Sequence, residues 1–246
     1  MWRATYSKPR GATEEVDIQT IAPLHLVAAA IPAMLVLFVL WRWRADAAQG
    51  FIALARMIAQ LLLVGYVLVY VFEADTPWVV LVVLGVMVVA ASWIALRTVP
   101  ALRGSLYRHA FFSVLAGGGV TLALVTQIVL SLDPWYEPKF VVPLAGMIFA
   151  ASMNSVSIAA ERLFAELNRS VPYVDARRIA LQAGLIPIVN TLLAVGLVSL
   201  PGFMTGQILS GVSPLIAVRY QVMVMCMIFG ASGLSAALFL TLVRRE

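Results

Sequence analysis

The stretch VGLVSLPGFMTGQILSGVSP, residues 195–214, contains no charged residue, yet helix breakers interrupt it repeatedly. The breakers are Pro201, Gly202, Gly206, Gly211 and Pro214. Such apolarity is typical of a membrane interior, where irregular backbone is tolerated only if protein or a water-filled cavity covers it. We therefore expect a short re-entrant or interfacial helix at about residues 203–210, on the outer side. It serves either as a gate or substrate exit, or as a packed loop cap.

The composition of the whole chain excludes a soluble protein. Of its 246 residues, 62% are hydrophobic and only 12% are charged, with a mean hydropathy of +0.97. Soluble globular domains carry roughly 25% charged residues. The chain is therefore expected to be an all-α integral membrane protein in a lipid bilayer. Its net charge of +5 is better explained as an orientation signal than as a nucleic-acid footprint, so no nucleic-acid partner is expected.

Seven stretches are long and apolar enough to cross a membrane, a length of about 20 residues. They are residues 22–41, 51–72, 78–96, 110–132, 141–160, 180–200 and 219–243. A polar tail, residues 1–20, precedes a single transmembrane domain, residues 21–246. Arginines concentrate in every second connection, and the positive-inside rule then predicts an external N-terminus and a cytoplasmic C-terminus. We expect a multi-pass cell-membrane protein.

No catalytic or nucleotide-binding signature is found in the sequence. A P-loop requires Gly-Lys followed by Ser or Thr, but the two lysines, Lys8 and Lys139, precede Pro9 and Phe140. The chain is therefore expected to be no enzyme and to bind no cofactor of its own.

Polar side chains within the spans are the first candidates for a pathway. Arg56 and Gln60 share one helix face, although Arg56 is also close enough to the span end to reach the headgroups. Asn154 lies among small residues that favour close helix packing, so it either bonds across an interface or lines a pathway. Asn190 follows Pro187, whose missing N–H has to be compensated within protein or against water.

Four segments closely resemble the FetB-like ABC transporter permeases. They are GLVSLPGFMTGQILSGVSPLIAVRYQVMVM (196–225), ARMIAQLLLVGYVL (55–68), PLAGMIFAASMN (143–154) and ALQAGLIPIVNT (180–191). That family includes a bacterial iron exporter and a plant aluminium-tolerance protein. The resemblance implies a homodimeric permease subunit, in a bacterial inner membrane, that exports a metal ion using ATP hydrolysed by a separate ABC ATP-binding subunit.

The motif positions and the polar span residues together define an expected substrate pathway or gate. Its members are Arg56, Gln60, Met147, Asn154, Asn190, Pro201, Gly202, Met204, Gln207, Tyr220 and Gln221. No metal ligands are assigned. Methionine thioethers suit a soft metal, whereas iron prefers oxygen or imidazole donors. An organic or sugar-nucleotide substrate stays open.

The cytoplasmic segment after the fifth span departs from the family. It reads AELNRSVPYVDARRIA (165–180) where relatives have a Leu-Gly-Ala-Thr-Pro-like turn, and it is shorter by about a helical turn. We expect Ser170 to cap a short helix that couples to the ATPase through Pro172, Tyr173, Asp175, Arg177 and Arg178. Otherwise the segment is a solvated loop, and the chain is an ATPase-independent channel or scaffold.

Overall fold

The computed structural model describes residues 23–73 and 76–243, and these residues are almost entirely helical. The chain divides into two compact units, Met1–Tyr66 and Val67–Glu246. The all-α prediction is confirmed. The predicted polar tail, residues 1–20, lies outside the described residues, and the single transmembrane domain stays a prediction.

The first unit contains α1 (Pro23–Arg42) and most of α2 (Ala47–Phe72), which continues into the second unit. The turn between the two helices includes Arg44 at a φ of 57°. Asp46 then caps α2, because its Oδ1 accepts a hydrogen bond of 2.8 Å from the backbone N–H of Gln49.

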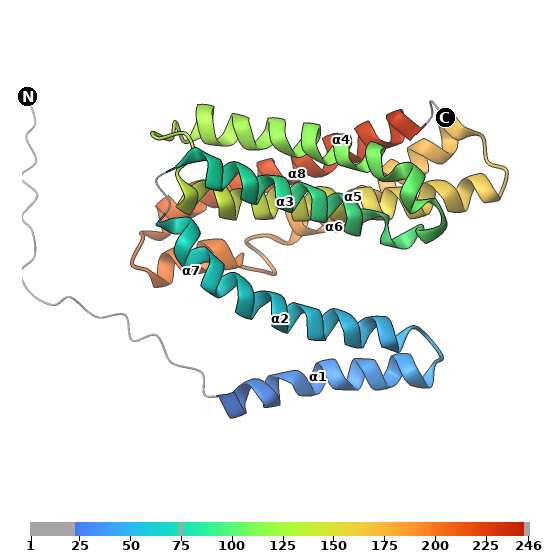
Figure 1. Cartoon of the computed structure of the whole chain (residues 1–246), viewed down its shortest axis with the longest axis horizontal. Coiled ribbons are helices and arrows are strands. Elements are labelled where there is room, and N and C mark those ends of the chain that lie inside the picture. The colour runs from blue at the N-terminus through green and yellow to red at the C-terminus, as the bar shows by residue number, and fades with distance from the viewer. Residues whose placement is uncertain (1–22, 74–75, 244–246) are drawn as a thin grey trace, which may run out of the picture. The chain divides into compact units, whose positions relative to one another are not determined.

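The second unit is a helix bundle (Figure 1). It consists of α3 (Pro77–Ala95), α4 (Arg103–Ala123), α5 (Pro138–Asn168), α6 (Tyr173–Ala194), the short α7 (Gly202–Leu209) and α8 (Pro214–Val243). Two 3₁₀ turns, η1 (Leu96–Thr98) and η2 (Pro100–Leu102), join α3 to α4, and the π-helical η3 (Leu124–Val129) extends α4. Proline opens α3, α5 and α8, where its missing N–H costs no helical hydrogen bond.

α5 and α8 form the centre of the bundle. α5 packs against α3, α4, α6 and α8, while α8 packs against α4, α5, α6 and α7. Small residues permit this close approach. A Cβ on Gly184 of α6 would lie 2.8 Å from the carbonyl oxygen of Ser155 and 3.3 Å from Ala159 Cβ, both on α5. The predicted packing role of small residues on the fifth span is thereby confirmed for Ser155 and Ala159.

A buried serine pair joins the two central helices. Ser235 Oγ of α8 donates a hydrogen bond of 3.0 Å to Ser152 Oγ of α5, and Ser152 Oγ donates one of 3.3 Å to the carbonyl of Ala231. Both hydroxyls are thus satisfied within the apolar core, as a buried polar group requires.

Six of the seven expected spans correspond to described helices that are long and apolar enough to cross a membrane. The expected sixth span, 180–200, differs. Its helix, α6, begins at Tyr173 and carries three charged residues in its first two turns, and it ends at Ala194. The chain turns at Gly196, where φ is 82°, so Pro201 and Gly202 begin α7 rather than ending α6. The expectation of a short helix near residues 203–210 is confirmed.

The short helix expected from Ser170 to Arg178 is wrong in its boundaries. α5 continues to Asn168, and Ser170 lies in the following turn at a φ of 62°. Pro172 is the N-cap of α6, with an extended ψ of 142°, and its fixed φ suits that position. Residues 173–178 are therefore the beginning of α6.

Candidate functional site

Polar residues gather at the two opposite ends of α5. At its C-terminal end lies the turn into α6, residues 162–178, which we name the α5–α6 corner. At its N-terminal end lies a cavity beside α7, which we name the α7 pocket.

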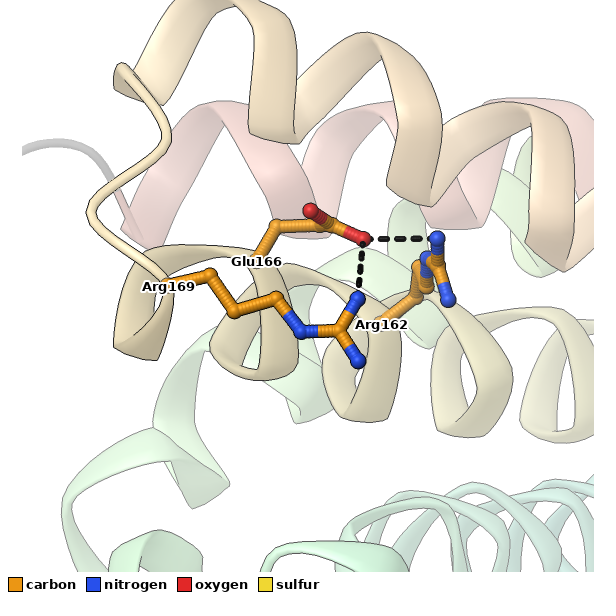
Figure 2. Close-up of polar contacts among 3 residues, drawn as sticks. All are labelled: Arg162, Glu166 and Arg169. Atoms are coloured by element: carbon orange, nitrogen blue, oxygen red, sulfur yellow. Dashed lines mark ion pairs between the residues drawn. The ribbon is translucent and has the colours of Figure 1, made fainter.

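Glu166 is the centre of the α5–α6 corner (Figure 2). One oxygen, Oε1, lies 2.6 Å from a guanidinium nitrogen of Arg162 and 3.7 Å from one of Arg169. The Glu166 side chain is 7% exposed, whereas those of Arg162 and Arg169 are 41% and 69% exposed. The carboxylate therefore holds two outward-facing arginines against the end of α5, and the cluster keeps one positive charge.

The beginning of α6 is attached to the end of α8. The hydroxyl of Tyr173 donates a hydrogen bond to the backbone carbonyl of Leu240. Asp175 Oδ1 lies 3.5 Å from a guanidinium nitrogen of Arg178, but both side chains are more than half exposed. An exposed pair of this kind contributes little to stability. The firm attachment of this turn therefore comes from Tyr173.

Arg177 and Arg178 line a groove of about 380 Å³ between α6 and α8. Its other lining residues are Val174, Leu181, Ala237, Leu240 and Thr241. Guanidinium groups bind carboxylates or phosphates with paired hydrogen bonds, so a basic groove of this kind suits an acidic partner surface. The structure thus brings the predicted coupling residues Pro172, Tyr173, Asp175, Arg177 and Arg178 onto one corner.

The α7 pocket has a volume of about 180 Å³ and is formed by the ends of four elements. Its lining residues are Leu130, Lys139, Phe140, Pro143, Leu144, Phe203, Gln207, Tyr220 and Met223. Gln207 of α7 and Tyr220 of α8, both predicted pathway residues, therefore line the same pocket. Gln207 Oε1 is buried without a hydrogen-bond partner among the described residues, and so is Oε1 of Gln221, which follows Tyr220.

The other predicted pathway residues are dispersed. Arg56 and Gln60 lie one turn apart on α2, within the first unit. Asn154 and Asn190 face outward on the second unit and line neither the corner groove nor the α7 pocket. Four further predicted residues belong to helices that form the α7 pocket but do not line it. They are Met147 of α5, the α7 N-cap Pro201, and Gly202 and Met204 of α7.

A larger cavity of about 480 Å³ lies between α3 and α4. Aliphatic and aromatic side chains dominate its wall, and Thr126 and Gln127 from the π-helical η3 contribute its polar edge. Gln127 Nε2 donates to Thr126 Oγ1 at 3.1 Å, so this edge is largely satisfied within the protein. This cavity is not predictable from the sequence, because a π-helix is not visible in a hydropathy pattern.

Glu166, Lys139 and Phe203 are among the residues of the two regions that were not predicted. Glu166 had a readable signal, since Arg162 and Glu166 are spaced i, i+4 on a helix. Lys139 is one of only two lysines and lies one turn before Pro143, and Phe203 follows the helix-starting Pro201-Gly202. Neither spacing indicates a pocket without the tertiary structure.

Within the described ranges, no three His, Cys, Asp or Glu side chains come together as a metal site.

Comparison with known proteins identifies similar membrane proteins. A family model described as "Uncharacterised protein family (UPF0014)" matches residues 23–177 and 171–246, two stretches that meet at the α5–α6 corner. A UPF0014 membrane protein of Synechocystis sp. is 36% identical over 206 residues, which are 78% of this chain and 80% of the relative.

Two further relatives carry functional names. The "Probable iron export permease protein FetB" of Escherichia coli is 30% identical over 79% of both chains. "Protein ALUMINUM SENSITIVE 3" of Arabidopsis thaliana is 30% identical over 75% of this chain and 71% of its own. No solved structure matches.

Proposed function

Because the chain belongs to the UPF0014 family of membrane proteins, we propose that it is the permease subunit of an ABC transporter that exports a metal ion such as iron. A separate ATP-binding subunit hydrolyses the ATP, and two copies of the chain form the permease in a bacterial inner membrane. The name of the Escherichia coli relative supports the iron and export parts of this proposal.

The observation that carries the proposal is the basic groove at the α5–α6 corner. Arg177 and Arg178 line it, and their guanidinium groups would bind carboxylates on the ATP-binding subunit. Glu166 holds Arg162 and Arg169 at the end of α5, on the same corner, and this cluster keeps a positive charge. By the positive-inside rule the corner is cytoplasmic, on the side where ATP is available.

A route for coupling follows from the contacts of this corner. Tyr173 joins the beginning of α6 to Leu240 near the end of α8. α8 is an unbroken helix of 30 residues, about 45 Å long, and its other end contributes Tyr220 to the α7 pocket. A displacement that ATP imposes on the corner would therefore reach the opposite end of the bundle through one rigid element.

The substrate class depends on the relative's name, since no cluster of His, Cys, Asp or Glu ligands occurs in the described part of the chain. Amide, hydroxyl and thioether groups would have to complete the coordination of a transported metal. Transport measurements should therefore compare iron with an organic or sugar-nucleotide substrate in the same proteoliposomes.

The first test is purification from native membranes in mild detergent, followed by mass spectrometry of the bound proteins. A stoichiometric subunit with a G-x-x-x-x-G-K-[ST] motif is expected. In the double variant Arg177→Ala/Arg178→Ala its affinity should fall by about tenfold or more, because each charged hydrogen bond contributes roughly 1.5–3 kcal/mol. The matched control is Arg42→Ala/Arg108→Ala, which removes the same charge from other exposed positions.

Two outcomes would contradict parts of the proposal. If the double variant retains the ATP-binding subunit as well as the control does, docking occurs elsewhere. If the intact chain repeatedly purifies without such a subunit, the second candidate function, an ATPase-independent channel or scaffold, is correct. The family model matches in two separate stretches that overlap at residues 171–177, and this division of the match is the observation that favours the second candidate.

A further inference from the structure

The α7 pocket combines a cation, buried acceptors and aromatic walls. Lys139, at the second position of α5, lines it and has no ion-pair partner among the described residues. Among the described residues, no acidic side chain lines the pocket. A wall that contributes an ammonium group and no carboxylate favours an anion and disfavours a bare metal cation.

Two acceptors next to the pocket lack partners. Gln207 lines the pocket, and its Oε1 is enclosed by protein without a hydrogen-bond partner among the described residues, although buried polar atoms are nearly always bonded. Pro143, another lining residue, has no N–H to donate to the carbonyl of Lys139 one turn earlier. An occupant that carries a hydrogen-bond donor would satisfy Gln207 Oε1 once the carboxamide turns toward the cavity.

The remaining walls set the size and shape of the occupant. Phe140, Phe203 and Tyr220 enclose the pocket with flat side chains, and Met223 closes it with a flexible thioether. Its 180 Å³ is the volume of about six water molecules in the liquid, at roughly 30 Å³ each. The space therefore suits a small organic molecule rather than a nucleotide.

We propose that the α7 pocket binds a small anion that also carries a hydrogen-bond donor, such as a phosphate or carboxylate bearing an amino or hydroxyl group. Lys139 binds the anionic group, the Gln207 carboxamide turns toward the ligand so that Oε1 accepts from the donor, and the aromatic residues pack against the carbon skeleton. The proposal does not depend on ATP coupling. A phospholipid headgroup and a free small molecule share this chemistry, and the experiment separates the two sources.

The experiment measures how fast an amine-reactive reagent modifies Lys139 in the purified full-length chain. Because Lys8 is the only other lysine, peptide mass spectrometry assigns the two rates separately and Lys8 serves as an internal control. Phosphoethanolamine, an anion with a donor, should slow the modification of Lys139 relative to that of Lys8. This ratio is the measured quantity, because the amine of phosphoethanolamine also consumes reagent and lowers both absolute rates. Sulfate, an anion without a donor, should protect at concentrations about tenfold higher, the difference expected for one hydrogen bond.

Two variants test the assigned residue. Gln207→Leu should remove the preference for phosphoethanolamine over sulfate. Gln182→Leu, a glutamine exposed on α6 outside the pocket, should leave it unchanged. The comparison of the two anions on the unmodified chain needs no variant, so it remains decisive if Gln207→Leu does not fold.

The source of the ligand follows from native mass spectrometry. Retained phosphatidylethanolamine, with protection by free phosphoethanolamine only after delipidation, indicates a lipid headgroup. Equal protection in both preparations without a retained lipid indicates a free solute. Absence of protection in both preparations, equal protection by sulfate, or protection by Mn²⁺ alone would overturn the proposal.

Discussion

Gly117 and Gly119 lie two residues apart on α4 in opposite surroundings. A Cβ on Gly117 would lie 2.5 Å from Ser235 Oγ and 2.7 Å from the Ser235 backbone nitrogen, whereas nothing lies within 4 Å of a Cβ on Gly119. Gly117→Ala should therefore lower the free energy of unfolding by ~1–3 kcal/mol through overpacking. Gly119→Ala should leave it unchanged or raise it by up to about 1 kcal/mol, since alanine favours helix.

Thermal unfolding in one detergent, followed by circular dichroism, compares the two variants directly. Equal midpoints for both would show that α4 and α8 are not in contact at Ser235.

Arg103 and Arg108 differ in the same way near the N-terminal end of α4. Arg103 donates two hydrogen bonds, of 3.0 and 2.6 Å, to the carbonyl of Trp93, and its guanidinium carbon lies 3.7 Å from the centre of the Trp93 ring. Arg103→Leu should cost about 1 kcal/mol of unfolding free energy and change the tryptophan fluorescence. Arg108→Leu removes the same charge from an exposed position and should do neither. A fluorescence change of equal size in Arg108→Leu would mean that net charge, not this contact, is responsible.

At the scale of elements, the sequence indicates where α7 begins and ends but not where the preceding helix, α6, ends. Its place is readable from the sequence because Pro201 and Gly202 favour a helix start and Gly211, at a φ of 86°, lies just beyond its end. The end of α6 is not readable, since residues 195–200 continue the apolar run without a helix breaker other than Gly196. An apolar run indicates which residues lie in the membrane, but the backbone hydrogen bonds decide at which residue the helix ends.

Gly202→Leu tests whether α7 acts as a gate. No heavy atom lies within 4 Å of a Cβ at Gly202, so the bundle should fold and express normally. If α7 moves as a gate, Gly202 has to approach another helix in the moved state, and a leucine side chain there should lower transport by about tenfold or more. The measurement is substrate efflux from proteoliposomes that contain the ATP-binding subunit.

The matched control for this gate is Gly104→Leu at the start of α4, where the Cβ is equally unobstructed. Normal efflux in Gly202→Leu would leave α7 as a static cap on the bundle.

At the scale of the whole molecule, the orientation of the chain stays a prediction with a direct test. After Cys226→Ser, single cysteines at Ser213 and Asn168 place one thiol at each end of the second unit, before α8 and at the end of α5. A membrane-impermeant maleimide should label Ser213→Cys in intact cells and Asn168→Cys only after permeabilisation. The reverse pattern would place the α5–α6 corner outside, away from ATP, and would contradict the proposed coupling.

The all-α membrane class, six of the spans and the presence of α7 follow from the sequence alone. They depend on local properties, namely hydropathy over about 20 residues and the backbone limits of proline and glycine. The pairing of Arg162 with Glu166 was equally within reach, because an i, i+4 spacing is also local.

The composition of the two sites depends on the tertiary structure. Lys139 and Tyr220 are 81 positions apart in the sequence and line one pocket, and Arg177 lines a groove with Thr241. The long-range pairing of α5, α6 and α8 arises from mutual fit at positions such as Gly184 against Ser155, where a missing side chain on one helix matches the backbone of another. A single sequence specifies the residues of such a contact but not which of them meet, because their proximity is a property of packed surfaces rather than of spacing along the chain.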